Sequence, residues 1–259
     1  MHSVNAPEEE AKRLYVDQSR FGERILEPDA GEWTIWDVGL GAATNVMGLI
    51  TTYEKWATEK GADRLRPVHI ISFERDLDPL RLAFKHSECF PQLRHSAPAH
   101  ILKTGEWKSK TLPLKWTLVF GDFSKTLRTV TPPDVIFYDP FSFKTDSLLW
   151  SWSFFQELYS VCAEKPTELY TYSASTAVRA GLLGAGFYVA RGVGTGPKKE
   201  TTIALTHSAK DSGHELLNNH WLGQWERSSA QYPIGLLAEE YSLFREKLYS
   251  HGQLSAIST

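Results

Sequence analysis

The sequence predicts an α/β fold built on a mostly parallel sheet. Short runs rich in β-branched and aromatic residues alternate with longer amphipathic runs, which is the pattern of βαβ units. A turn rich in small residues follows the first predicted strand and leads into a helix. The 259 residues are 42% hydrophobic and 23% charged, which is enough to bury one large α/β core or two small ones.

The first half of the chain carries four predicted strands and two predicted helices. A helix over 44–58 is indicated by Val46, Leu49 and Ile50 on one face. A second helix over 78–84 is indicated by its start signal, Asp78-Pro79. The strands are expected at 33–38, 68–73, 114–120 and 134–138.

The second half continues the alternation and ends in a helix. We expect helices at 148–162, 176–183 and 234–249, and strands at 168–172, 186–190 and 201–206. A Gly/Lys-rich connection joins the last two strands, so these two are expected to be antiparallel. With no internal repeat and no clean linker, the sequence predicts one domain over 33–259, preceded by an N-terminal extension over 1–32.

Composition excludes several classes of protein. No run approaches eighteen apolar residues, so no membrane span is expected. Met1–Glu10 has no apolar segment of the kind found in secretory signals. Cys89 and Cys162 stand far apart and form no CxxC pattern, and the histidines show no metal spacing. We therefore expect a cytoplasmic protein with no metal.

Net charge at first argues against a nucleic-acid partner, but charge is unevenly distributed. Lys plus Arg is 28 and Asp plus Glu is 31, a net charge of −3. Residues 1–32 hold eight acids and four bases, whereas residues 94–128 hold seven bases and two acids. The basic stretch is either an ordinary solvated surface or a docking surface for a polyanion. Composition alone leaves both open.

Four acids stand at the ends of four successive predicted strands. They are Asp37, Glu74, Asp122 and Asp139. Any one of them could be a helix cap or a surface acid. Together they predict a ligand crevice, because the carboxyl ends of parallel strands meet at the same edge of an open sheet. A carboxylate at Glu74 suits the two hydroxyls of a ribose.

The turn after Asp37 helps to identify the ligand. The segment DVGLGAATN, residues 37–45, offers a close backbone approach and the N–H groups of a helix N-terminus. Thr44 stands where a dinucleotide fingerprint has its third glycine, which disfavours a pyrophosphate. An acid-lined pocket suits a ligand with a positive centre and no phosphate, and S-adenosylmethionine fits that description.

These residues carry a family resemblance that covers most of the chain. The segments DVGLG at 37–41, ISFE at 71–74, GD at 121–122 and DPFS at 139–142 resemble class I methyltransferases. More narrowly, the chain resembles the methyltransferase domain of MnmC-type proteins, which complete the 5-methylaminomethyl group on the wobble uridine of tRNA. The specific parts are DPFSFK at 139–144 and GTGPKKE at 194–200, supported by TYS at 171–173 and WERS at 225–228.

The chain also departs from the family pattern. Phe143 stands where a proline is usual, and residues 145–148 lack the usual Asn-Pro. His2-Ser3 resembles a family motif that usually has residues before it. The FAD-dependent oxidase half of fused members is not expected in 259 residues.

The resemblance implies a Rossmann-like fold with a mostly parallel seven-stranded sheet, helices on both faces and an antiparallel last strand. It implies S-adenosylmethionine as cofactor and an amine on tRNA as substrate. Asp139 is the expected catalytic residue, positioning the amine and helping to take its proton. The expected cofactor-binding residues are Asp37, Gly39, Gly41, Asn45, Glu74, Asp122, Phe123 and Asp139.

In these roles, Glu74 would hold the ribose, and Asp122 the adenine amino group with Phe123 on a ring face. Gly39 and Gly41 would line the methionine part. The expected substrate-binding residues are Phe141, Lys144, Trp150, Lys198, Lys199 and Glu200. The resemblance implies that Lys198 and Lys199 clamp phosphates and that Glu200 orders their turn. Ordinary structural alternatives are core packing for Phe141 and Trp150, and a solvated turn for the two lysines.

Two other functions remain open at the level of sequence. One is a methyltransferase acting on a small-molecule or protein amine. The other is a protein of methyltransferase shape that binds S-adenosylmethionine without catalysis. Asp139 favours catalysis, and steep salt dependence of tRNA binding would distinguish a tRNA enzyme from one acting on a small molecule.

Overall fold

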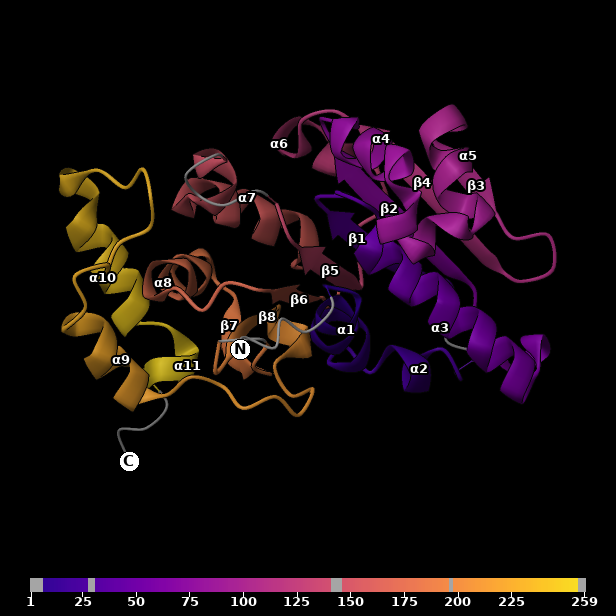
Figure 1. Ribbon diagram of the computed structural model, residues 1–259. Coiled ribbons are helices and arrows are strands. Elements are labelled where there is room, and N and C mark those ends of the chain that lie inside the picture. Colours follow the sequence, from indigo (N-terminus) through magenta and orange to yellow (C-terminus); the bar gives the residue numbers. More distant parts are fainter. Residues whose placement is uncertain (1–6, 28–30, 141–145, 196–197, 256–259) are drawn as a thin grey trace, which may run out of the picture. The chain divides into compact units, whose positions relative to one another are not determined.

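The computed structural model describes residues 7–27, 31–140, 146–195 and 198–255. The chain separates into two compact units, Met1–Asp139 and Pro140–Thr259, and each is described by itself (Figure 1). The division of the chain predicted at residue 32 stays a prediction.

Unit 1 contains five strands and the helices that connect them. In chain order its main elements are α1 (Pro7–Ala11), η1 (Lys12–Asp17), α2 (Phe21–Arg24), β1 (Trp33–Val38), α3 (Thr44–Lys60), β2 (Val68–Glu74), α4 (Asp78–Lys85), α5 (Ser96–Thr104), β3 (Glu106–Lys108), β4 (Leu114–Phe120), α6 (Phe123–Thr126) and β5 (Val135–Tyr138).

The strands of unit 1 lie in the order β3-β4-β2-β1-β5. β1 pairs in parallel with β2 and with β5, and β2 pairs in parallel with β4. β3 is a three-residue antiparallel strand at the edge. Every residue of β1 and β5 is buried, as expected for central strands covered on both faces.

The order of the strands creates a switch point between β1 and β5. From β1 the chain steps outward through β2 to β4, and it then returns to place β5 on the other side of β1. Because parallel crossovers are right-handed, connections that run in opposite directions lie on opposite faces of the sheet. Ligands of open α/β sheets bind outside the carboxyl ends of strands at such a point, which here is the end of β1 and β5.

The N-terminal helices pack against α3 (Figure 1). Gly48 of α3 allows a close approach, because a Cβ there would lie 3.3 Å from Cγ2 of Val16. Phe21 stacks on Trp33 of β1, with ring centroids 5.5 Å apart. Residues of this segment, Val16 and Phe21, are thus packed against α3 and β1.

Unit 2 contains three strands and a helical C-terminal part. Its main elements are η7 (Ser147–Trp150), α7 (Trp152–Cys162), β6 (Glu168–Thr171), α8 (Thr176–Ala185), β7 (Tyr188–Gly192), β8 (Thr201–Leu205), α9 (Asn219–Glu226), η9 (Ala238–Glu240), α10 (Tyr241–Tyr249) and α11 (Gly252–Ser255). β8 pairs antiparallel with both β6 and β7, so the antiparallel last strand is confirmed.

The fold class is confirmed, with eight strands in the described residues in place of seven. The additional strand is β3, which is too short to show an alternating pattern in the sequence. The helices α5 and α9 were also not expected. The closing helix begins at Tyr241 and not at 234, because Gly235 has a φ of +77° and Glu240 accepts a hydrogen bond from the N–H of Leu237 at 2.9 Å.

Candidate active site

The turn between β1 and α3 has the shape that the sequence predicted for a ligand loop. Gly39, Gly41 and Ala43 all have positive φ, at 93°, 51° and 62°. A Cβ on Gly41 would meet nothing within 4 Å, so the backbone there faces open space. No side chain among the described residues caps the N-terminus of α3. The turn therefore presents backbone and the positive end of a helix dipole to a ligand.

Asp37 lies fully buried at the end of β1. Its Oδ2 accepts a hydrogen bond of 2.8 Å from Ser72 Oγ, which in turn accepts one of 2.9 Å from Trp116 Nε1. Oδ1 is buried and makes no hydrogen bond to any described residue. Burial raises the pKa of Asp37 to about 7, Asp139 and Glu74 add to the rise, and Ser72 and Asn45 oppose it. An acceptor left without a donor in such a place fits a cationic ligand.

Asp139 lies beside Asp37 at the end of β5. Its N–H donates to the carbonyl of Val38 at 3.0 Å, which continues the pairing of β5 with β1. Asn45, in the first turn of α3, donates from Nδ2 to Asp139 Oδ2 at 3.5 Å. Asp139 as a whole residue is exposed. Asp37, Asn45 and Asp139 thus converge at the switch point, as the sequence predicted for strand-end residues.

Glu74 ends β2 with its carboxylate held by backbone N–H groups. Oε1 accepts from Arg75 N at 2.8 Å and Asp76 N at 2.9 Å, and Oε2 accepts from Gly41 N at 3.4 Å. Only 7% of Glu74 is exposed. A carboxylate fixed this way is preorganised, and its lone pairs outnumber these three donors. Its position beside the glycine turn suits the predicted ribose contact.

The third acid has a structural role that the sequence left open. Asp122 Oδ1 caps α6 by accepting from Ser124 N at 3.0 Å and Ser124 Oγ at 2.8 Å. Phe123 is buried, with its ring centroid 4.7 Å from that of Phe73 and 5.9 Å from that of Trp36. Both residues thus serve packing and capping. Their contacts with adenine stay predictions.

Among the predicted substrate-binding residues, Phe141 and Lys144 lie outside the described residues. Trp150 is buried in unit 2, and its ring centroid lies 6.5 Å from that of Phe155, which is the core packing that the sequence left open for it. Lys199 is exposed.

Lys198 is engaged within unit 2. Its Nζ donates to the carbonyl of Tyr172 at 3.0 Å and lies 3.5 Å from the centroid of that ring. Gly194, the first glycine of GTGPKKE, is required by close approach, because a Cβ there would lie 2.5 Å from the carbonyl oxygen of Lys199. Gly194 therefore lies directly against the backbone of Lys199, between β7 and β8 in the chain. The phosphate contact expected of Lys198 stays a prediction.

Glu200 holds this connection in place. Its Oε1 lies 2.7 Å from Arg179 Nη1 and its Oε2 lies 3.0 Å from Arg191 Nη1. Arg179 is 3% exposed and also donates to Thr202 Oγ1 and to the carbonyl of Thr201. Burial raises the pKa of Glu200, but hydrogen bonds and charges from Arg179 and Arg191 outweigh this and leave the pKa below its ordinary value.

We expect Glu200→Gln to lower the free energy of unfolding at pH 7 by about 1–3 kcal/mol, because it leaves the buried Arg179 without its charge partner. The loss is smaller than for an ion pair with both partners fully buried, because Glu200 is partly exposed to water. The folded-state pKa is depressed, so the stabilisation is present above pH ~4.3 and lost as pH falls through the folded pKa. Denaturant unfolding of both chains at pH 7 and at low pH measures this. Glu215→Gln is the control, since Glu215 is 80% exposed and lies 3.8 Å from Arg191. An equal loss in the two variants would contradict the assignment.

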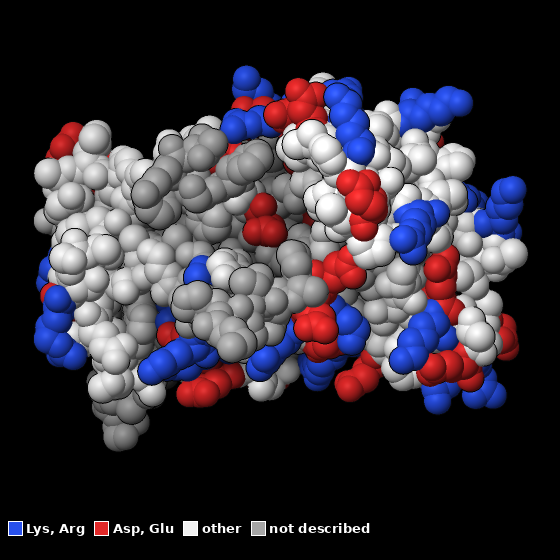
Figure 2. Space-filling model, in the orientation of Figure 1, with Lys and Arg blue, Asp and Glu red and all other residues white. Residues whose placement is uncertain are grey.

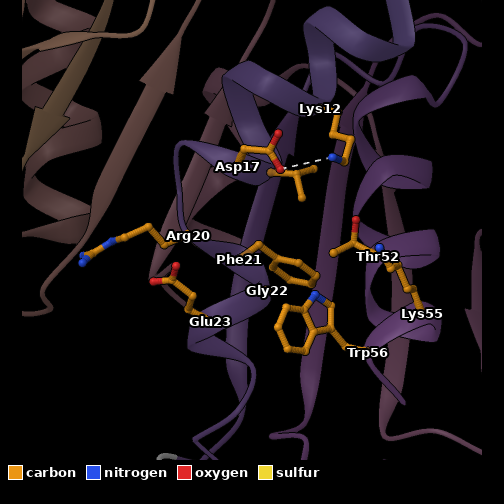
Figure 3. A pocket seen from close by; sticks show the side chains of 10 residues that line it. Lys12, Asp17, Arg20, Phe21, Gly22, Glu23, Thr52, Lys55 and Trp56 are labelled. Atoms are coloured by element: carbon orange, nitrogen blue, oxygen red, sulfur yellow. Dashed lines mark ion pairs between the residues drawn. The ribbon is translucent and has the colours of Figure 1, made fainter. Parts of the chain in front are cut away.

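A separate cavity of about 280 Å³ lies between the N-terminal helices and α3 (Figure 3). Phe21 and Trp56 form its apolar wall, and Lys12 forms an ion pair of 3.4 Å with Asp17 at its edge. None of the predicted site residues lines it. No pattern in the sequence indicates this cavity.

Charged side chains are mixed on the face shown in Figure 2. Lys and Arg lie interspersed with Asp and Glu on that face and do not gather in one patch. Lys115 of the basic stretch pairs with Glu32 at 2.9 Å. Within the described ranges, no helix is long and apolar enough to cross a membrane, and no group of three His, Cys, Asp or Glu side chains could hold a metal ion.

Residues 85–207 match the model of a family described as S-adenosyl-L-methionine-dependent methyltransferase. The predicted methyltransferase resemblance is confirmed. The chain is also similar to the tRNA 5-methylaminomethyl-2-thiouridine biosynthesis bifunctional protein MnmC of Aliivibrio fischeri, 24% identical over 80% of this chain and 32% of that protein. The MnmC protein of Hahella chejuensis is 27% identical over 76% of this chain and 32% of its own length. The chain thus spans about a third of the length of these relatives.

The methyltransferase fold is also found in a solved structure. MnmC2 from Aquifex aeolicus aligns with 96% of this chain and 77% of its own, with a TM-score of 0.65 and 21% identity. The methyltransferase class and S-adenosylmethionine as its cofactor, both predicted from sequence, agree with the family match.

Sequence reasoning missed several residues around the site. Ser72 and Trp116 support Asp37 from β2 and β4, and Tyr15 lies close to Asp37 and Asp139. Serine and tryptophan inside strands give no pattern that separates support of a carboxylate from ordinary packing. Tyr15 is not found from the sequence, because its segment is predicted to be an N-terminal extension outside the domain.

Proposed function

We propose that this chain is an S-adenosylmethionine-dependent N-methyltransferase that acts on tRNA in the cytoplasm. The substrate is 5-aminomethyluridine, with or without 2-thiolation, at the wobble position, and the product is the corresponding 5-methylaminomethyluridine. The observation that carries the proposal is the convergence of Asp37, Asn45 and Asp139 at the switch point of the sheet. The similarity of the chain to MnmC proteins supports it.

The residues present fit the cofactor. The buried Asp37 Oδ1 without a donor suits a cationic group, the open space at Gly41 admits a ligand beside the backbone, and the fixed carboxylate of Glu74 suits a diol. When bound, S-adenosylmethionine supplies an electrophilic methyl group on a sulfonium. Asp37, Gly39, Gly41 and Glu74 would hold it.

On the substrate side, the work of the protein is orientation and proton handling. The amine must be neutral before its lone pair can attack, and Asp139 is exposed where an entering substrate can reach it. Its carboxylate accepts a hydrogen bond from the amine, fixes the direction of the lone pair and takes up a proton that the nitrogen releases. Orientation of this kind contributes up to roughly 7–11 kcal/mol to lowering a barrier.

The decisive experiment is incubation of the chain with S-adenosylmethionine and tRNA that carries 5-aminomethyl-2-thiouridine. Nucleoside mass analysis should show that modified uridine gaining one methyl group, and tRNA without the aminomethyl group should gain none. Activity at subsaturating tRNA should fall steeply with salt, because phosphate contacts release counterions.

Methylation of a small amine with no effect on tRNA would favour the second candidate, an enzyme acting on a small-molecule or protein amine. The mixed charge on the face in Figure 2 is the observation in favour of that candidate. Binding of S-adenosylmethionine with no methylation of any amine would favour a non-catalytic homologue.

A further inference from the structure

The N-terminal segment brings a buried hydroxyl to the two site carboxylates. Tyr15 lies in η1 and is 2% exposed. Its hydroxyl makes no hydrogen bond of ordinary geometry to any described residue, although Asp139 and Asp37 are close enough to act on it. A buried hydroxyl without a partner is costly, so this position requires an explanation.

Packing fixes where that hydroxyl lies. The ring of Tyr15 contacts Phe137, with centroids 4.9 Å apart. Phe137 stands opposite Asp37 in the register of β1 and β5 and two residues before Asp139. Val16, the next residue, packs on Gly48 of α3. The aromatic ring is therefore held between fixed elements at the carboxyl end of the two central strands.

A second polar atom without a partner comes from the same segment. Glu10 Oε1 is buried and makes no hydrogen bond to a described residue, and the Glu10 carboxylate acts on Tyr15. The Tyr15 hydroxyl and Glu10 Oε1 are thus two buried oxygen atoms with no ordinary hydrogen bond to a described residue, and the carboxylate of Asp139 acts on the same hydroxyl. Two carboxylates and a hydroxyl are rich in acceptors, and the group that satisfies several acceptors at once is an amine or ammonium.

We propose that Tyr15 is a positioning residue for the substrate amine: its hydroxyl donates a hydrogen bond to Asp139 and accepts one from the amine nitrogen, with Glu10 as a further acceptor. This inference rests on the proposed function and names the part of the chain that recognises the amine. The group recognised at this position is a primary amine on a flexible methylene, and not a nucleobase or a phosphate.

The chemistry of Tyr15 suits this task. Burial and the charges of Asp139, Asp37 and Glu10 hold the pKa of its phenol well above the ordinary value, so the hydroxyl stays protonated and can donate. A hydrogen bond donated to a carboxylate favours the charged form. Tyr15 therefore offers a donor to the carboxylate of Asp139, the group proposed to accept a proton from the amine.

The test compares Tyr15→Phe with the native chain in methyl transfer to aminomethyl-bearing tRNA. We expect kcat/KM for tRNA to fall about 10- to 100-fold, the range for loss of a hydrogen bond to a charged group. The dissociation constant of S-adenosylmethionine, measured by calorimetry in the absence of tRNA, should stay unchanged. The acidic limb of the pH–rate profile should move to higher pH, because Asp139 loses a donor while the charge of Asp37 still acts on it.

Two matched controls separate this role from packing. Tyr53→Phe removes another buried tyrosine hydroxyl, one that donates to the carbonyl of Arg66 at 2.8 Å. Glu9→Gln changes an exposed acid next to Glu10 in α1. Both controls should keep the native pH–rate profile, and Glu10→Gln should lower kcat/KM less than Tyr15→Phe does.

Three outcomes would overturn the inference. An unchanged kcat and pH–rate profile in Tyr15→Phe would show that the hydroxyl has no part in amine recognition. A loss of S-adenosylmethionine affinity in parallel with kcat/KM would assign the hydroxyl to the ammonium group of the cofactor. A fall in rate with no move of the acidic limb would leave packing as its role. Failure of the native chain to methylate tRNA would instead refute the proposed function, so the two failures are distinguishable.

Discussion

Asp139→Asn is expected to lower kcat for methyl transfer about 10²- to 10⁴-fold, the range for loss of a general base. Asparagine has nearly the same shape and can still accept the hydrogen bond that Asn45 donates at 3.5 Å. What it lacks is the negative charge that takes up a proton. Single-turnover methylation of tRNA with saturating S-adenosylmethionine measures the chemical step directly.

Cofactor affinity provides the complementary measurement for this variant. S-adenosylmethionine should bind Asp139→Asn nearly as well as the native chain, because Asp37, Glu74 and the glycine turn are untouched. Asp134→Asn is the control: Asp134 precedes β5 at its other end, and its Oδ2 accepts from Thr34 N at 2.8 Å. If Asp139→Asn kept a native single-turnover rate, Asp139 would not be the base.

The sequence predicted the central strands and the convergence of acids because both depend on local patterns. Strands buried on both faces are continuous apolar runs, as at Trp33–Val38 and Val135–Tyr138, and the end of such a run fixes where Asp37 and Asp139 stand. Parallel pairing then brings the two together with no further information.

Other parts of the site depend on contacts that leave no local pattern. Tyr15 reaches Asp139 only because η1 packs on α3 through Gly48, and that contact joins residues more than thirty positions apart. Glu200 was predicted as a substrate contact from a motif. Its pairing with Arg179 and Arg191 depends on the register of β7 and β8.

Asp37→Asn is expected to raise the free energy of unfolding and to lower the affinity for S-adenosylmethionine. Asp37 is fully buried, and its pKa is raised to about 7, whereas an unfolded aspartate titrates near ~3.9. Between these two pH values the folded state binds more protons than the unfolded state. The free energy of unfolding of the native chain therefore falls as pH rises from about 4 to about 7.

Removal of this titration should change the pH dependence in a defined direction. A shift of about three units corresponds to roughly 4 kcal/mol, so Asp37→Asn should be more stable than the native chain above pH 7 by up to about 4 kcal/mol. The difference should become small near pH 4 and close below about pH 3, where the aspartate is protonated in both states. Denaturant unfolding from about pH 3 to pH 8 measures the two curves, with Asp134→Asn as the control that keeps Asp37.

The same substitution should weaken the binding of S-adenosylmethionine, because a neutral amide attracts a cationic ligand less than a carboxylate does. In the native chain, affinity should rise as pH increases through about 7, since the ligand favours the ionised form of Asp37. In Asp37→Asn this rise should be absent. A variant that is both more stable and weaker in binding would show that the buried charge is kept for the ligand at a cost to the fold, which is the pattern of a functional site. Native affinity in Asp37→Asn, with the same pH dependence as before, would remove Asp37 from the cofactor site.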